Sequence, residues 1–376
     1  MENRKNILIL MHNDATQFID IANQYVSLFD KNQYKVTVAY LANNTDTHAR
    51  NKTLSEEVLF LNCSKKDIRG LKINAIKKLT ALCRKEKFHL VISHRYKPIY
   101  IMTWVALFVR IPAIIFVMHA MKTLEYFSRK LFIAIFSRKN MYFAGVSNAV
   151  RDDLRKAIWR VPSDRVVTLY NAINMQAAES QLFSKTEARK ILNLPEEAFI
   201  IGTIGRLSPE KDQQNIIHAF ARVKFDFPQA KLLIIGDGPL EQHLKALVNT
   251  LHLQNDVIFS GFVAHAQRFI KAFDIFILAS TKEAFGRVLL EAMIGKIPVI
   301  GTRTNGIPEV IGDAGILVDA RDPHALFSAI LNIAKLPQNE LSAFGNKGYE
   351  RIKSQFSTDK FNQDFWGSDW KKAVAN

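Results

Sequence analysis

The sequence predicts an α/β protein made of two doubly wound parallel sheets that face each other across a cleft. The chain has 376 residues, more than one hydrophobic core normally serves, so two domains are expected. Short apolar runs alternate with stretches of helical periodicity in both halves, a pattern typical of parallel sheets covered by helices. Hydrophobic residues make up 48% and charged residues 23%, as in folded globular proteins.

The first domain is predicted to cover residues 1–178. Its apolar runs predict strands at 7–11, 35–40, 90–93, 113–118, 143–146 and 166–170. Helices are expected at 20–29, 73–85, 99–109, 128–135 and 150–158. The apolar stretch 99–118 has the length of a membrane span, which remains the alternative. Because Arg110 and Pro112 interrupt it, we interpret it as a buried helix followed by a buried strand.

The second domain is predicted to cover residues 179–356. Strands are expected at 199–204, 231–235, 257–260, 275–278 and 297–301, with helices at 213–225, 241–251, 266–272 and 288–294. The polar stretch 174–186 has no clear period and is predicted to be a linker. In the last segment, 357–376, an amphipathic helix over 358–372 carries four large aromatic side chains: Phe361, Phe365, Trp366 and Trp370.

Positive charge is concentrated in the first domain. Residues 1–178 contain 28 Lys and Arg against 13 Asp and Glu, whereas residues 179–376 contain 23 against 22. This asymmetry predicts a polyanionic partner, namely anionic lipid, a phosphorylated glycan or nucleic acid, with solubility as the plain alternative. Two cysteines and no Cys-His cluster indicate a reducing compartment without a metal site. The apolar run 7–11 is too short for a signal peptide, so a cytoplasmic location is expected.

Two cations follow the strand predicted at 199–204. Gly205 allows a ligand to approach the backbone, and Arg206 and Lys211 are suited to bind phosphate oxygens. An ordinary surface turn is the alternative. Gly236 and Asp237 follow the next strand, where the alternative is a strand-to-helix turn with Asp237 as a cap.

A second motif extends from Glu283 to Glu291. The segment from Phe285 to Val288 reads as a loop that feeds a helix, whose free N–H groups and dipole favour an anion. A carboxylate accepts two hydroxyl donors, so Glu283 suits a sugar and Glu291 a ribose diol. Taken singly, each acid also fits a solvated helix face.

Together these motifs resemble glycosyltransferase family four, whose members have the GT-B fold of two Rossmann-like domains. The matching patterns are Gly205 to Lys211 and the Glu283/Glu291 pair; the resemblance is strong over 185–325 and weaker over 1–180. It implies that Arg206 and Lys211 bind a donor diphosphate, that Glu283 and His119 contact the transferred sugar, and that the first domain binds the acceptor. The implied donor-binding residues are Gly205, Gly236, Phe262, Val263, Phe285, Gly286, Val288, Leu289 and Glu291.

The resemblance further implies retention of anomeric configuration, no metal and no cofactor besides the nucleotide-sugar substrate. It also implies a final helix that packs back on the first domain. The absence of an Asp-x-Asp pair after any predicted strand agrees with metal independence. Where the family usually carries glycines, this chain has His12, Asn13 and Asp14, which suggests polar acceptor contacts. The basic stretch with His94, Arg95 and Lys97, together with Lys122, is expected to bind a phosphorylated or lipid-linked glycan acceptor.

The function expected is transfer of a hexose or N-acetylhexosamine, from a UDP-sugar in preference, to a glycan like the bacterial lipopolysaccharide core. The mixed apolar and basic stretch 121–140 favours peripheral contact with the inner face of an anionic membrane, with a core-facing helix as the alternative. Alternative functions are a nucleotide-sugar 2-epimerase or a noncatalytic polyanion-binding protein. Nucleic acid is disfavoured as a partner, because no recognition module is present and Glu283 and Glu291 would have no role.

Overall fold

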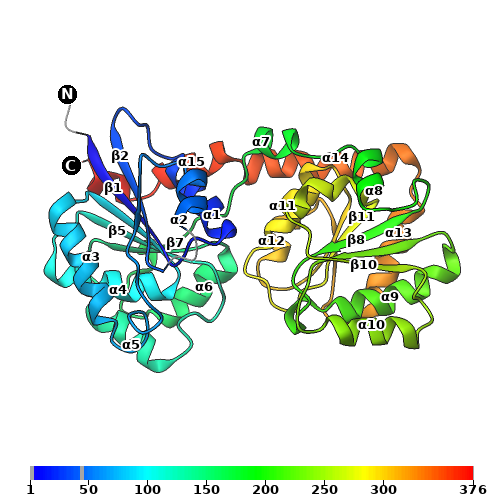
Figure 1. The fold of residues 1–376 in the computed structure, drawn as a ribbon, viewed down its shortest axis with the longest axis horizontal. Coiled ribbons are helices and arrows are strands. Elements are labelled where there is room, and N and C mark those ends of the chain that lie inside the picture. Colours follow the sequence, from blue (N-terminus) through cyan, green and yellow to red (C-terminus); the bar gives the residue numbers. More distant parts are fainter. Residues whose placement is uncertain (1–3, 43–45, 376) are drawn as a thin grey trace. The chain divides into compact units, whose positions relative to one another are not determined.

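The computed structural model describes residues 4–42 and 46–375, which form two compact units (Figure 1). Unit 1 comprises Met1–Ala172 and Phe361–Asn376, and unit 2 comprises Ile173–Lys360. The domain boundary predicted at residue 178 lies a few residues after the observed one and falls inside the helix Met175–Ser180. Each unit is an α/β layer structure with its own sheet, as predicted.

Unit 1 is built on a seven-stranded sheet of order β3-β2-β1-β4-β5-β6-β7. All its strand pairs are parallel. The strands are β1 (Lys5–Met11), β2 (Tyr34–Tyr40), β3 (Glu57–Phe60), β4 (Leu90–His94), β5 (Ala113–Met118), β6 (Met141–Gly145) and β7 (Val166–Thr168). Every residue of the central strands β4 and β5 is buried, as expected for a sheet covered on both faces. The prediction of a helix and a strand over 99–118 is confirmed by α4 and β5.

In the first part of the chain this sheet is accompanied by α1 (Thr16–Val26), α2 (Asp46–Lys52), α3 (Ile73–Glu86), α4 (Tyr96–Phe108), α5 (Phe127–Phe136), α6 (Asn148–Ala157) and the short 3₁₀ helix η1 (Ser163–Arg165). Helix α4 buries seven residues, whereas α6 buries three apolar side chains and turns charged residues outward. Among the described residues, none of the helices combines the length and the apolar character that crossing a bilayer requires.

Unit 2 has a six-stranded parallel sheet of order β10-β9-β8-β11-β12-β13. Its strands are β8 (Ile200–Ile204), β9 (Lys231–Ile235), β10 (Val257–Gly261), β11 (Ile275–Leu278), β12 (Val299–Thr302) and β13 (Ile316–Val318). Its helices are α7 (Met175–Ser180), α8 (Lys185–Ile191), η2 (Pro209–Lys211), α9 (Gln213–Asp226), α10 (Glu241–Thr250), η3 (Ala266–Ala272), α11 (Arg287–Ile294), α12 (Ile307–Ile311), α13 (Pro323–Ala334) and α14 (Gln338–Gln355).

Two predicted segments differ from the structure. The stretch 174–186, predicted to be a linker without regular structure, contains α7 and the start of α8. Asn174 caps α7 through its side chain, and Ser184 caps α8 in a capping box, so polar residues here begin helices. The single helix predicted over 358–372 is two helices, α15 (Thr358–Trp366) and α16 (Trp370–Ala375), separated by Gly367, Ser368 and Asp369.

The end of the chain packs into unit 1 through its aromatic side chains. Phe361 packs edge-on against Tyr25 with ring centroids 5.1 Å apart, and Phe365 packs against Phe29 at 5.9 Å. Trp366 donates a hydrogen bond through Nε1 to the Leu28 carbonyl at 3.2 Å. The four aromatic residues of the tail therefore extend the core of unit 1 from a distant part of the sequence.

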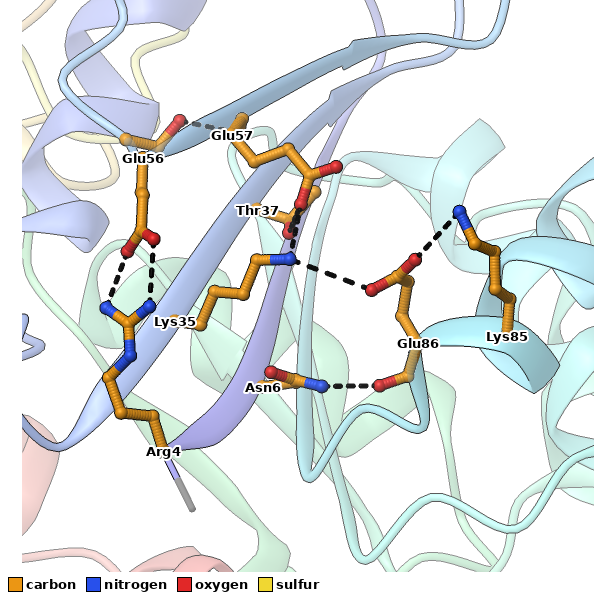
Figure 2. A network of polar contacts seen from close by, with 9 residues as sticks. Arg4, Asn6, Lys35, Thr37, Glu56, Glu57, Lys85 and Glu86 are labelled. Carbon is orange, nitrogen blue, oxygen red and sulfur yellow. Dashed lines mark hydrogen bonds and ion pairs between the residues drawn. The ribbon is translucent and has the colours of Figure 1, made fainter. Parts of the chain in front are cut away.

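The amino-terminal edge of the unit 1 sheet carries a network of paired charges, shown in Figure 2. Arg4 binds Glu56 through two hydrogen bonds of 2.8 and 2.9 Å. Lys35 lies 3.0 Å from Glu57 and 3.8 Å from Glu86. These residues flank the starts of β1, β2 and β4 and the first residue of β3. Glu56, Glu57 and Glu86 thus pair with cations at the end of the sheet opposite to the carboxyl ends of the strands.

Candidate functional site

The order of strands in unit 2 places a topological switch point between β8 and β11. The chain runs outward from β8 to β9 and β10 on one side, and from β11 to β12 and β13 on the other. Loops that leave neighbouring strands in opposite directions open a crevice at their carboxyl ends, where ligands of such sheets bind. Of the two motifs selected from the sequence, Gly205–Lys211 begins directly after β8, and Glu283–Glu291 begins a few residues after the end of β11.

The structure joins these two motifs through an ion pair between Lys211 and Glu283. The side chains are 24% and 17% exposed, respectively, so the pair is only partly screened by water. The Ser280 hydroxyl lies 3.5 Å from the same Glu283 oxygen. The backbones are also linked, because the Thr281 N–H donates to the Glu210 carbonyl at 2.8 Å. Each residue was predicted separately, and their contact was not.

A third loop fixes the position of Glu283. The Glu283 N–H donates to Oδ1 of Asn305 at 3.4 Å, and the Gly306 N–H donates to the Glu283 carbonyl at 3.0 Å. The Thr302 hydroxyl donates to the Ser280 carbonyl at 2.6 Å. Asn305 and Ser280 are therefore positioning residues. The sequence marks the Asn305–Gly306 turn as a tight loop on the same edge of the sheet that affects donor-sugar contacts, but it does not single out Ser280.

Arg206 does not join the ion pair. Its side chain is exposed, while its carbonyl accepts a hydrogen bond from Nε2 of the buried Gln213 at 2.9 Å. The backbone at Arg206 is thereby fixed, while the residue stays exposed. An arginine with a fixed backbone and an exposed side chain is suited to bind an anionic ligand.

Two glycines of this region, Gly236 and Gly205, are explained by different physical causes. Gly236 has φ of 139°, and a Cβ there would lie 2.0 Å from the Gly205 carbonyl oxygen. Gly236 is therefore required by the packing of two loops. A Cβ at Gly205, by contrast, would meet nothing closer than the Lys211 side chain at 3.9 Å. Packing does not demand a glycine at Gly205, so open space for a ligand is the better account of it.

The loop before α11 presents backbone, not side chains, to a ligand. Gly286 occupies the N-cap of α11 with φ of 93°. Phe285 is buried against Phe356, with ring centroids 5.5 Å apart, and Leu289 is fully buried. Their predicted donor contacts are therefore limited to backbone groups. Val288 and Glu291 are half-buried on the same helix.

At the end of β10 an aromatic ring is exposed. Phe262 is 75% exposed, next to the half-buried Val263. It follows Gly261, whose φ is 67°, at a shift in the register between β9 and β10. Gly261 also accepts a hydrogen bond from the Gly236 N–H at 2.8 Å. An exposed ring on an anchored loop suits stacking against a flat base.

The switch point of unit 1 lies between β1 and β4. His12 and Asn13 are half-buried after β1, whereas Asp14 is buried. Of the three residues predicted to contact the acceptor here, His12 and Asn13 are therefore the more accessible. Burial, together with the charges of Lys97 and Arg95, lowers the pKa of His12 to about 4. His12 is therefore neutral near pH 7 and serves as a hydrogen-bonding group, not as a charge.

His94 and His119 form a pair whose ring nitrogens Nδ1 and Nε2 lie 2.9 Å apart. His94 is fully buried, and burial with the neighbouring His119 holds its pKa well below the usual value. His94 is only 1% exposed, and its predicted direct contact with an acceptor stays a prediction. Its role is to hold the half-buried His119 at the carboxyl end of β5.

Lys122 forms a loose ion pair at the surface, and its predicted contact with an acceptor stays a prediction. Its ammonium lies 3.9 Å from the Glu125 carboxylate, and its backbone N–H donates to Asp153 at 2.7 Å. Its charge is thus partly compensated, unlike those of Arg95 and Lys97. Among the described residues, no group of three or more His, Cys, Asp or Glu is arranged to hold a metal ion. Metal independence itself stays a prediction.

Comparison with known proteins agrees with two units of this type. A family model described as Glycosyltransferase Family 4 matches residues 24–177, and one described as Glycosyl transferases group 1 matches residues 184–351. A solved Anabaena structure, of HepE in complex with UDP, superposes with a TM-score of 0.79 at 18% identity, over 96% of this chain and 98% of that one. This likeness shows the fold, which is the GT-B fold predicted from the sequence.

Curated relatives include the N-acetyl-alpha-D-glucosaminyl L-malate synthase of Bacillus anthracis, 34% identical over 53% of this chain and 52% of the relative. The lipopolysaccharide core biosynthesis glycosyltransferase LpsE of Rhizobium meliloti is 30% identical over 46% of this chain and 49% of the relative. The chain thus spans about half the length of these two relatives. Each unit thus matches a family model of glycosyltransferases, and the fold is of the GT-B type.

Proposed function

We propose that the protein transfers a hexose or N-acetylhexosamine from a UDP-sugar to a lipopolysaccharide core or a related lipid-linked glycan, with retention of anomeric configuration. The proposed binding of the donor in unit 2 rests on the ion pair between Lys211 and Glu283 at the switch point of its sheet. UDP is favoured because the similar Anabaena fold is described in complex with UDP. The acceptor class is supported by the name of the Rhizobium relative.

In the proposed reaction, Lys211 and Arg206 bind the donor diphosphate. An ammonium has three N–H donors, so Lys211 can keep Glu283 as one partner and still offer donors to phosphate oxygens. Glu283 orients this ammonium and accepts hydroxyl donors from the sugar. As the glycosidic bond breaks, negative charge grows on the diphosphate, and fixed cations stabilise it without reorganising.

The free N–H groups at the start of α11, beside Gly286, complete the proposed diphosphate site. Phe262 stacks on the base, and Glu291 binds the ribose. His119, held by His94, is the proposed sugar-binding residue of unit 1. Retention without a protein nucleophile is proposed to follow a front-face displacement, in which the leaving phosphate oxygen takes the proton of the acceptor hydroxyl.

Contact with an anionic membrane is a further part of the proposal. Helix α5 and the residue before it expose Tyr126, Phe127, Leu131 and Ile135, which are each 40% to 70% exposed. Exposed Arg138 and Lys139 follow the helix. An apolar face flanked by cations suits a peripheral position at the inner face of the cytoplasmic membrane.

The test is a donor screen followed by product analysis. The full chain is titrated calorimetrically with UDP-, GDP- and ADP-glucose, and the donor that binds is incubated with isolated lipopolysaccharide core in excess chelator. A glycan product with retained configuration is expected. Epimerised nucleotide-sugar without acceptor would instead favour a 2-epimerase. Binding of every donor without turnover would indicate a noncatalytic protein, and collapse of activity in chelator would reveal a metal site.

A further inference from the structure

Four cations gather near the carboxyl end of β4 in unit 1, and we refer to them as the cationic cluster: Lys72, Arg95, Lys97 and Arg129. The Lys72 ammonium lies 4.1 Å from the centroid of the Tyr100 ring, and the Arg129 guanidinium lies 4.3 Å from that of Tyr96. The two rings are 6.2 Å apart on α4. Cation–π contacts therefore hold charges from α3's first turn and from α5 over one helix.

The members of the cluster carry like charges that act on one another. Burial lowers the pKa of Lys72, and the charges of Lys97 and Arg129 lower it further. Lys97 and Arg95 act in the same direction on His12. No salt bridge of the described residues includes a member of the cluster, whereas Arg4 and Lys35 at the opposite edge of the sheet are paired with acids (Figure 2). Like charges held together without a counter-ion favour an anionic ligand.

Arg95 occupies a backbone conformation that side chains rarely adopt. Its φ of 68° and ψ of 161° lie in a region populated almost entirely by glycine, at a cost of about 1–3 kcal/mol. Its N–H donates to the Val117 carbonyl at 3.0 Å, and its guanidinium lies 4.9 Å from the Phe18 ring centroid. The position of this cation, directly after β4 at the switch point, is therefore held by contacts on both its backbone and its side chain.

We infer that the cationic cluster binds a phosphate or diphosphate group carried by the acceptor. The inference rests on the proposed function and specifies which part of the acceptor is recognised. Phosphate offers several charged oxygens, which match two guanidinium forks and two point-charge ammonium groups better than a single carboxylate does. Lys72 and Arg129, which the sequence did not mark for this role, join the predicted Arg95 and Lys97. The phosphate can come from a phosphorylated sugar or from the diphosphate of a lipid carrier.

The test is calorimetric titration of the full chain with glucose 6-phosphate, farnesyl diphosphate and, as the uncharged reference, glucose. Saturating UDP is present so that the donor site is filled. Binding of at least one phosphate compound, and none of glucose, is expected, and the tighter of the two identifies the source of the phosphate. Lys97→Ala and Arg129→Ala should each weaken that binding at least tenfold, and Arg129→Lys should weaken it less than Arg129→Ala.

Lys156→Ala is the matched control, because Lys156 is an exposed cation on α6 of the same unit. Equal loss in Lys156→Ala and Lys97→Ala would overturn the inference, as would equal affinity for glucose and its phosphate. Circular dichroism establishes that each variant is folded. UDP affinity of the wild type is measured separately: UDP binding without phosphate binding overturns the cluster's role alone, whereas phosphate binding without UDP binding overturns the proposed donor.

Discussion

At the scale of single residues, the contact between Lys211 and Glu283 joins positions 72 residues apart in the chain. The sequence identified both residues from their local patterns and assigned them to phosphate and sugar, respectively. It did not predict that they touch, because that depends on β8 lying next to β11. Alternating strands and helices do not specify which strands become neighbours. For the same reason the hydrogen bond by which Asn305 holds the backbone of Glu283 was not predicted.

Removing either donor-site cation should slow transfer strongly. Lys211→Ala and Arg206→Ala should each lower kcat by about two to three orders of magnitude, because each removes a fixed charge that stabilises the leaving diphosphate. Steady-state kinetics with a saturating UDP-sugar measures this. Lys282→Ala is the control, since Lys282 is exposed in the same loop as Glu283. Near-normal rates in both cation variants would remove the diphosphate assignment.

The stability of unit 1 should depend on pH through His12. Its pKa is lowered to about 4 in the folded protein, whereas the unfolded chain has a value near 6.5. Between these values the unfolded state binds more protons, so stability is complete above pH 6.5 and is lost as pH falls toward 4. The loss is at most about 3 kcal/mol. Urea unfolding of His12→Asn should show a shallower pH dependence than the wild type across this window, and identical slopes would contradict the pKa assignment.

At the scale of elements, the sequence predicted the buried strands most accurately. The ranges 113–118, 231–235 and 275–278 coincide with β5, β9 and β11, because continuous apolar runs mark strands covered on both faces. The strands β3 and β13 were missed: each is at the edge of its sheet, is three or four residues long and buries only one residue. Such a strand is defined by its neighbour's hydrogen bonds and leaves little pattern in its own sequence.

Two glycine substitutions should separate packing from ligand access. Gly236→Ala places a Cβ 2.0 Å from a carbonyl oxygen and should lower the melting temperature by several degrees or more. Gly205→Ala meets no atom closer than 3.9 Å, so it should leave stability within about 0.5 kcal/mol while weakening UDP binding. Thermal unfolding and calorimetry measure the two effects.

The control for Gly236→Ala is Gly261→Ala. Gly261 also has positive φ but has nothing within 4 Å of the added Cβ, so only the backbone penalty of roughly 1–2 kcal/mol remains. If Gly236→Ala were no more destabilising than Gly261→Ala, the close packing of the two loops would not explain the glycine.

At the scale of the whole molecule, the charge asymmetry seen in the sequence has a structural counterpart in unit 1. Acids pair with cations at the amino-terminal edge of the sheet, and cations without such pairs gather after β4. The counts along the chain predicted an anionic partner but not this separation, which requires the sheet to place Glu57 and Arg95 at opposite edges. The final helix was likewise expected to pack on the first domain. In the structure, aromatic side chains of the tail contact Tyr25 and Phe29 of unit 1.

Membrane contact should depend on the exposed apolar face of α5. Phe127 and Leu131 are one helical turn apart and are 70% and 40% exposed. Burying such side chains in a bilayer interface contributes roughly 1.5–3 kcal/mol each when burial is complete. The double change Phe127→Ser with Leu131→Ser should therefore weaken binding to vesicles containing phosphatidylglycerol at least tenfold in a flotation assay.

Phe225→Ser provides the matched control, because Phe225 is 88% exposed but belongs to α9 of unit 2. The control should bind vesicles like the wild type. An equal loss in Phe225→Ser, or no loss in the double variant, would exclude α5 as the membrane-binding face.

In the proposed function, unit 2 holds the donor diphosphate with Arg206 and Lys211, which follow the carboxyl end of β8. A crystal structure of the protein with the UDP-sugar that binds in the donor screen tests this directly. Diphosphate oxygens are expected within hydrogen-bonding distance of the Lys211 ammonium and the Arg206 guanidinium, with the base beside Phe262. A diphosphate bound elsewhere, with Lys211 still paired to Glu283 alone and Arg206 turned to solvent, would contradict it.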